Sequence, residues 1–432
     1  MNKIVLSAIT AMALGSVTLS ALTLYTNDSG EIYKTPGEGR VKMGDFVKDT
    51  TVENKTPKQN TTIVKEDSSS SSEKNFLDRL HFKGDLRLRY ESKETFYKDG
   101  TESTNKSTYH NRYRLRLVAA ADLTDNLKFD VGMRSGYGNP TSGNQTFLND
   151  KALSDYMWQS MRFNILDIAY KNGDSTVKVG RHPYMIYRPI KSQLIWDNDI
   201  SLNGASYNYE DESRIINAGV NQPTYAERVN ARDSVNLYFA QYVEKMKLDS
   251  LKLNLGAGIY YYDGLKGNTA MYYPEKDGKK MGNTFITDAS GNDVYKNDFH
   301  ILEAFAELKF KDVLGKPLTL AVGGAYNAAA SNKNFGYDLA FQLGKAKNVQ
   351  DWQVKYSYTD IPEDAVLGAH SDSDNFGGGS AAKGHAIRAK YKFGKNTYLA
   401  GNFFFSTLYA GKTDGKPEAD YERVQLDVII KF

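Results

Sequence analysis

Basic side chains recur at every second position in several segments of this 432-residue sequence, most plainly at Arg112, Arg114 and Arg116. A guanidinium stays charged at any physiological pH, so a row of arginines on one face carries a permanent positive charge. In a confined aqueous space such a face concentrates anions, whereas on an open surface the same residues are simply solvated. The expected basic wall comprises Arg87, Arg89, Arg112, Arg114, Arg116, Arg134, Arg388 and Lys390, continued by Lys83, Lys128, Lys392, Arg423 and Lys431, and opposed only by Asp85, Asp130 and Asp427.

Residues that could catalyse a reaction or bind a metal do not fall into a recognised spacing. The six histidines are scattered, there is no cysteine, and neither H-E-x-x-H nor G-x-S-x-G occurs. The stretch "DSDNFG" begins like a calcium loop at Asp372, but Phe376 replaces a ligand and Lys383 takes the place of the closing Glu. The stretch "GGGSAAKG" (377–384) lacks the ending of a phosphate loop and is typical of a flexible external loop. We therefore expect no enzyme, no cofactor and no metal site.

The elements that must position the basic side chains are two-faced strands. In "FKGDLRLRY" the residues Phe82, Leu86, Leu88 and Tyr90 alternate with charged ones, which is the period of a β-strand. Similar alternation continues to the last segment, "ERVQLDVIIKF", where Phe432 is in phase with the apolar face. No apolar run reaches the ~20 residues that a membrane-spanning helix needs, so only a barrel would place this chain in a membrane.

The connections between these strands alternate in length. Outer-membrane barrels have this property, with short turns on one side and long loops on the other, whereas a soluble sandwich has no reason for it. The pattern predicts an all-β fold: an antiparallel up-and-down transmembrane barrel of about sixteen strands, with both ends of the barrel segment on the short-turn side. The expected turns are 124–126, 172–175, 211–213, 245–250, 311–315, 345–349 and 394–395, and the expected loops are 92–110, 138–160, 183–202, 221–233, 263–298, 328–335, 360–382 and 409–420.

The N-terminal part divides into two segments before the barrel, which we expect over 81–432. Residues 1–21 have a basic start at Lys3, an apolar stretch and small residues at the end, the pattern of a cleaved export signal. Residues 22–80 are polar, rich in Lys and Thr, and include a serine run, which favours a disordered periplasmic arm or linker. A small hairpin turning at 28–30 is the alternative.

The final strand and two internal motifs carry a resemblance to a known family. A terminal aromatic such as Phe432, with apolar residues at alternate positions before it, is similar to the assembly signal of bacterial outer-membrane proteins. Together with "KVGRHPY" (178–184) and "WDNDISLNGASYNYE" (196–210), residues 81–432 resemble the putative porin family of Gram-negative bacteria. The resemblance implies a bacterial outer-membrane location, recognition by the barrel-assembly machinery, contact with lipid and lipopolysaccharide, and a homotrimer.

The resemblance also implies that the third long loop folds into the barrel and forms its constriction. The segment 183–202 has the apolar content for this, including Leu194, Ile195 and Trp196. Its polar side chains would then face the basic wall and set up a field across the opening. The constriction residues expected on this basis are Tyr187, Arg188, Lys191, Asp197 and Asp199.

The functional expectation is a passive diffusion channel for small hydrophilic solutes and ions that favours anions. The alternative is a surface adhesion or structural barrel with a closed lumen, in which the long loop 263–298 carries the function. The formal charge of +3, spread along the whole chain, gives no argument for nucleic-acid binding.

Overall fold

The computed structural model describes residues 22–27, 32–33, 38, 40–46, 76–98, 106–136, 140–147, 161–224, 234–249, 251–270, 280–412 and 416–432. The chain divides into two compact units, Met1–Ser72 and Glu73–Phe432. The first long strand of the second unit begins at Leu80. The proposed export signal 1–21, the serine run and the turn at 28–30 fall outside the described residues.

The first unit contains a three-stranded antiparallel sheet. Strand β1 (Leu22–Asn27) lies between β2 (Ile32–Tyr33) and β3 (Arg40–Phe46). In the β1–β2 hairpin Tyr25 is paired with Tyr33. Strands β1 and β2 lie on either side of the turn that the hairpin alternative expects, and β3 is a third strand that the sequence pattern did not indicate.

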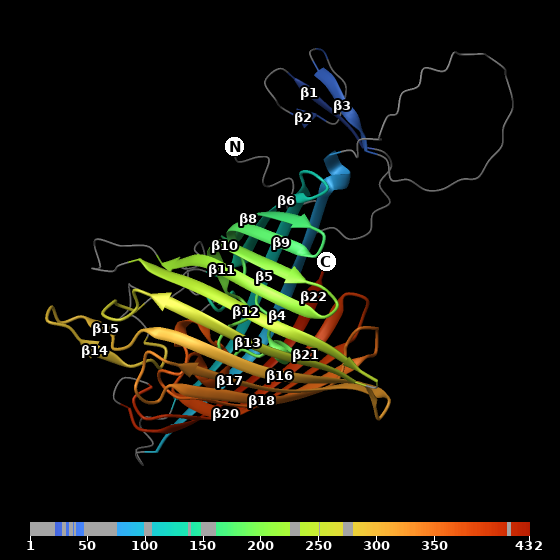
Figure 1. The fold of residues 1–432 in the computed structure, drawn as a ribbon. Helices are drawn as coiled ribbons and strands as arrows, with labels where there is room; N and C mark the ends of the chain where they lie inside the picture. Colours follow the sequence, from blue (N-terminus) through green and yellow to red (C-terminus); the bar gives the residue numbers. More distant parts are fainter. Residues whose placement is uncertain are drawn as a thin grey trace. The chain divides into compact units, whose positions relative to one another are not determined.

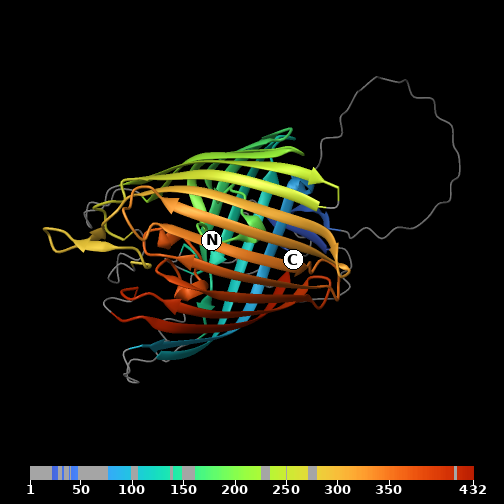
Figure 2. The ribbon, with the colours of Figure 1, turned by 60° about the horizontal axis from the view of Figure 1, so that its bottom comes forward.

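The second unit is a closed antiparallel barrel of sixteen long strands, in which each strand pairs with its neighbours in the chain and the last pairs with the first. Figures 1 and 2 show the strands inclined to the barrel axis, with the long loops gathered at one end. The strands are β4 (Leu80–Tyr97), β5 (Lys106–Asp122), β6 (Leu127–Ser135), β8 (Met161–Asn172), β9 (Ser175–Pro183), β10 (Ser201–Glu210), β11 (Arg214–Thr224), β12 (Val235–Leu248), β13 (Leu251–Asp263), β16 (Phe299–Val313), β17 (Lys316–Asn327), β18 (Phe335–Gly344), β19 (Trp352–Ile361), β20 (Ala382–Lys392), β21 (Thr397–Leu408) and β22 (Ala419–Lys431).

Short elements occupy the connections. The 3-10 helix η1 (Phe76–Arg79) precedes β4, and β7 (Gln145–Thr146) pairs with β5 beyond the end of β6. The hairpin of β14 (Phe285–Thr287) and β15 (Asp293–Tyr295) stands at the loop end, as Figure 2 shows. The 3-10 turns η4 (Pro189–Lys191), η6 (Gly368–His370) and η7 (Asn375–Gly377) lie in two of the long loops. No helix in the described part of the chain has the length and apolar character needed to cross a bilayer.

The predicted alternation of faces is confirmed, since outward residues such as Leu88 and Tyr90 are exposed while Arg89 between them is buried. Two expected boundaries are wrong because polar strand ends were interpreted as connections. The expected loop 92–110 is largely strand: β4 continues to Tyr97 and β5 begins at Lys106, with Glu94 paired opposite Ser107. The expected turn 245–250 is shorter, because β12 continues to Leu248.

Candidate functional site

The loop between β9 and β10, residues 184–200, runs across the inside of the barrel and is called the crossing loop below. On one side, the backbone N–H of Ile190 donates to Glu307 Oε1 on β16 (2.8 Å), and Ser192 Oγ donates to Asp338 Oδ2 on β18 (2.5 Å). On the other side, Arg116 on β5 lies 3.2 Å from the Asp199 carboxylate. In the strand order, β5 and β16 are half the ring apart. The crossing loop therefore spans the lumen.

Apolar side chains hold the crossing loop inside the barrel, as the sequence pattern predicted. Leu194, Ile195 and Trp196 are buried in a cluster with inward residues of the wall, among them Leu237 and Tyr260. The Trp196 ring lies edge-on to the Tyr260 ring, with centroids 5.5 Å apart. Burial of this apolar surface favours the folded-in position over one exposed to water.

The expected constriction residues do not share one role. Tyr187 is an anchor, because its hydroxyl donates to Glu307 and its backbone N–H donates to Gln241 (2.8 Å). Arg188 braces the loop itself by donating to the carbonyl oxygens of Ser192 and Trp196, both at 2.8 Å. Lys191 is exposed, and only Asp199 forms ion pairs with the predicted basic wall.

A second loop, residues 362–381 between β19 and β20, also folds into the barrel and is called the inner loop below. The interpretation of 377–384 as a flexible external loop is wrong, because 377–381 belong to the inner loop and 382–384 begin β20. Residues 377–379 are glycines with positive φ, and a Cβ on Gly379 would lie 2.1 Å from the carbonyl oxygen of Met281. The signal that could have identified the inner loop is the apolar stretch from Ala365 to Leu367, which is fully buried.

The crossing loop and the inner loop are joined to each other. The N–H of Asp197 donates to the His370 carbonyl oxygen (2.7 Å), and the N–H of Ser373 donates to Asp197 Oδ2 (2.9 Å). The rings of Trp196 and His370 stack with centroids 5.3 Å apart. Burial lowers the pKa of His370 to about 3, while burial and then the carboxylates of Asp199 and Asp372 raise the pKa of Asp197. His370 is therefore a neutral part of this junction at physiological pH.

The junction should depend on Trp196. We expect Trp196→Ala to loosen both loops, because truncating a packed tryptophan costs about 3–5 kcal/mol. The measurable result is faster proteolytic cleavage within 184–200 and 362–381 and greater current noise in a planar bilayer. Trp352→Ala is the matched control, since Trp352 is 38% exposed on the outer face while Trp196 is 1% exposed. Equal behaviour of the two variants would show that Trp196 does not hold the loops.

The predicted basic wall is an interleaved network of arginines and carboxylates. Arg89 donates to both oxygens of Asp427 (2.6 and 2.8 Å), and Arg423 lies 2.5 Å from Glu91. Arg112 donates to the same Glu91 at 3.0 Å. Barrel closure creates the contacts of Asp427 and Arg423, because it brings β22 beside β4, whereas Arg112 lies on β5, the next strand of the chain.

The two loops bring further carboxylates to the wall. Asp374 lies 2.9 Å from Arg423, and Asp372 lies 3.1 Å from Arg388. Asp199 reaches Arg114 at 3.6 Å as well as Arg116. The expectation that only Asp85, Asp130 and Asp427 oppose the wall is thus wrong, because Glu91 was assigned no partner and the inner loop was placed outside the barrel.

The remaining predicted wall residues also have defined places. Arg87 donates to Asn144 Oδ1 (2.5 Å), and Arg134 donates to the carbonyl oxygens of Asp199 (3.0 Å) and Pro140 (2.9 Å). Arg114 and Arg116 share Asp85, at 2.9 and 2.6 Å. Lys390 faces the lumen without an ion pair among the described residues. Most arginines in this wall therefore have a carboxylate partner. The lysines of the wall form no ion pair with a carboxylate among the described residues.

Metal binding has no support in the described part of the structure, where no group of three or more His, Asp or Glu side chains could hold an ion.

A closed sixteen-stranded antiparallel barrel with a loop folded across its lumen has the architecture of a porin. The model of the family described as putative porin matches residues 92–290 and 296–432, so the chain belongs to that family. Membership supports an outer-membrane channel, a class that is typically not enzymatic. No curated protein sequence matches the chain significantly.

Three solved structures are similar to this chain. OprB of Pseudomonas putida superposes with a TM-score of 0.51 at 15% identity, over 83% of this chain and 95% of that one. OmpF of Salmonella typhi in a complex with daunomycin has a TM-score of 0.46 at 11% identity, over 82% and 97% of the two chains. OmpT of Vibrio cholerae, in its trimer form, has a TM-score of 0.44 at 12% identity, over 82% and 99%. The similarity to OprB shows the shared fold.

Proposed function

We propose that this protein is a passive diffusion channel for small hydrophilic solutes and ions, with a preference for anions. The observation that best supports the channel function is the crossing loop. It spans the lumen from Glu307 on one wall to Arg116 on the opposite wall, and so narrows the barrel with charged side chains. We include in the proposal export by residues 1–21, insertion into the bacterial outer membrane by the barrel-assembly machinery with Phe432 as its signal, and contact with lipid and lipopolysaccharide. Residues 22–80 act as a periplasmic arm in this account, and no cofactor takes part.

The proposed anion preference depends on the cations that solutes can reach. Arg114 is paired with Asp85 and its side chain is only 9% exposed, whereas the Arg116 side chain is 36% exposed. Arg116 also faces a cavity of about 380 Å³ on the turn side of the crossing loop. The carboxylates beside this cavity, Asp85 and Asp199, form ion pairs with Arg114 and Arg116 and offset part of the positive charge. We therefore expect a moderate preference for anions rather than a strong one.

The reversal potential in a chloride gradient tests this preference. We expect Arg116→Glu to shift it toward cations in dilute salt and much less in concentrated salt, because the Debye length falls from about 10 Å at 0.1 M to about 3 Å at 1 M. Arg214→Glu is the control, since Arg214 is an exposed residue at the start of β11. If the Arg116 variant has the wild-type reversal potential at low salt, solutes do not pass this residue.

The second candidate function is a structural or adhesive barrel with a closed lumen. It is favoured by the packing of the crossing loop and the inner loop into one apolar cluster at the loop end of the lumen. The two candidates differ in whether the folded protein passes ions.

We also propose a homotrimer. The outer face of β10 and β11 carries small residues, including Ala205 and Ala218, which line a shallow hollow together with Tyr238 and Tyr261. A wall with such a surface suits close contact with another barrel better than contact with lipid alone.

A further inference from the structure

Three lysines surround one tyrosine inside the barrel at its turn end. The ammonium groups of Lys390, Lys392 and Lys431 lie 5.8, 5.6 and 5.2 Å from the centre of the Tyr398 ring. Tyr398 is on β21, and the lysines come from the strands on either side of it, β20 and β22. We call these four residues the lysine cluster.

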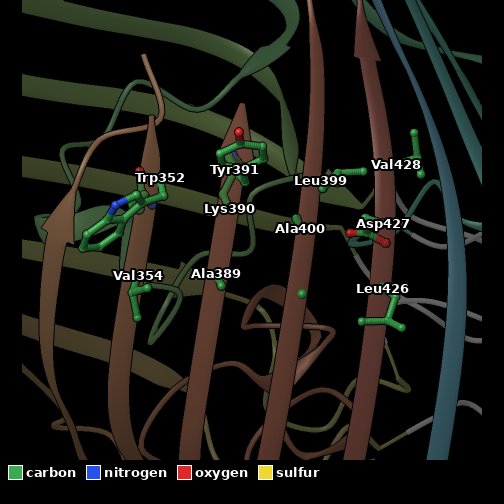
Figure 3. A pocket seen from close by; sticks show the side chains of 12 residues that line it. Trp352, Val354, Ala389, Lys390, Tyr391, Leu399, Ala400, Leu426, Asp427 and Val428 are labelled. Atoms are coloured by element: carbon green, nitrogen blue, oxygen red, sulfur yellow. The ribbon is translucent and has the colours of Figure 1, made fainter. Parts of the chain in front are cut away.

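The register of the strands places the cluster on the lumen face. Lys392 is paired opposite Tyr398, and Lys390 is paired opposite Ala400, which is in turn paired opposite the lumen-facing Asp427. Figure 3 shows Lys390, Ala400 and Asp427 on these three neighbouring strands. Their sequence neighbours Tyr391 and Leu426 are exposed on the outer face.

No lysine of the cluster forms an ion pair with a carboxylate within the described residues. Lys390 and Lys431 form no ion pair there, and Lys392 donates to the carbonyl oxygen of Lys347 (2.7 Å). The two nearest acids have other partners: Asp427 is held by Arg89, and Asp85 by Arg114 and Arg116. The ammonium groups of Lys431 and Lys191 repel that of Lys390, and the Asp427 carboxylate attracts it more weakly. The cluster therefore has an excess of positive charge on the lumen face of the barrel.

Space for a solute lies beside the cluster. Of the lysine cluster, Lys431 lines the cavity of about 380 Å³. The other charged residues of its lining are Lys83, Asp85, Arg116, Arg134 and Asp199, and the cavity lies against the turn side of the crossing loop. Ammonium groups on flexible stems are rotatable donors that suit a compact, multiply charged oxyanion. A monovalent chloride ion would compensate less of the mutual repulsion.

We propose that the lysine cluster binds phosphate and small phosphate-bearing solutes. This deepens the proposed channel function by naming its solute class. Phosphate brings about two negative charges at neutral pH and several acceptor oxygens to three ammonium groups that form no ion pair with a carboxylate among the described residues. The binding step replaces repulsion between lysines by charge-assisted hydrogen bonds.

Titration calorimetry of the full-length protein in detergent tests the site with inorganic phosphate as the probe. We expect saturable binding by the wild type and a loss of about tenfold or more in affinity for Lys390→Gln/Lys431→Gln, since charge-assisted hydrogen bonds are lost. Lys247→Gln/Lys311→Gln removes the same charge on β12 and β16, away from the cluster, and should bind like the wild type. Folding of each variant is checked by its heat-dependent migration in a gel, and the single variant Lys431→Gln, of an exposed residue, should lose part of the affinity.

Phosphate binding that is equal in the cluster variant and the wild type would overturn the proposal. Equal affinity of the wild type for succinate would also overturn it, because the site would then accept any dianion. Calorimetry requires no ion flow, so the two proposals can fail separately. If the protein binds phosphate but passes no chloride current, the proposed channel function is wrong and the proposed phosphate site is supported.

Discussion

Replacing the crossing loop, residues 184–200, with a short glycine–serine turn is expected to raise the single-channel conductance several-fold. The loop spans the lumen between β16 and β5 and packs there with the inner loop, so its removal frees cross-section for ions. The change is feasible because Pro183 and Ser201 are already paired at the ends of β9 and β10. A short turn can therefore join these strands as a hairpin. Planar bilayer recording gives the conductance.

The control replaces the exposed tip of the β14–β15 hairpin, residues 288–292, with the same linker. This variant should retain the wild-type conductance. A loop-shortened barrel that is folded but conducts like the wild type would show that the crossing loop does not limit the flow of ions.

Deleting Phe432 is expected to remove most of the folded barrel from the outer membrane. The N–H of Gly84 donates to the Phe432 carbonyl oxygen (2.7 Å), and the N–H of Phe432 donates to the Gly84 carbonyl oxygen (3.1 Å). These bonds close the seam between β22 and β4, and an open sheet edge is not tolerated in hydrocarbon. Quantification of folded protein in outer-membrane fractions checks the expectation. The control is Phe393→Ala, which removes an exposed ring at a neighbouring turn.

Gly84→Val tests the same seam with Phe432 still present. A Cβ at Gly84 would lie 2.5 Å from the Phe432 ring and 2.6 Å from the Arg116 carbonyl oxygen, so the ring or the backbone must move. We expect this variant to refold poorly in detergent. If it refolds normally while the Phe432 deletion fails only in cells, Phe432 acts as a recognition signal rather than as part of the seam.

The strands and their faces were predictable because apolar and polar residues alternate along the sequence with a period of two. Arg89 and Leu88 must lie on opposite faces of their strand, and in the barrel Arg89 is buried while Leu88 is exposed. The position of the crossing loop was also predictable, because Leu194, Ile195 and Trp196 would be unfavourable in water. Strand ends were less predictable, since polar residues on β4 beyond Glu91 resemble a loop.

The charge balance of the lumen was not predictable from one segment at a time. Arg423 and Glu91 are separated by 332 positions and meet only because the barrel closes. Asp374 joins Arg423 only because the inner loop folds inward, and its sequence, "DSDNFGGG", favours an external loop by composition. For the same reason the sequence does not distinguish the lysines of the cluster from the arginines that have carboxylate partners, because those partners lie far away in the chain.

The unitary current of the purified, folded protein in a planar bilayer tests whether this barrel is an open channel. The proposed channel predicts discrete current steps in potassium chloride, with ions passing the crossing loop beside the arginine–carboxylate network. The absence of current from protein that is demonstrably folded and inserted would contradict it and favour the closed barrel.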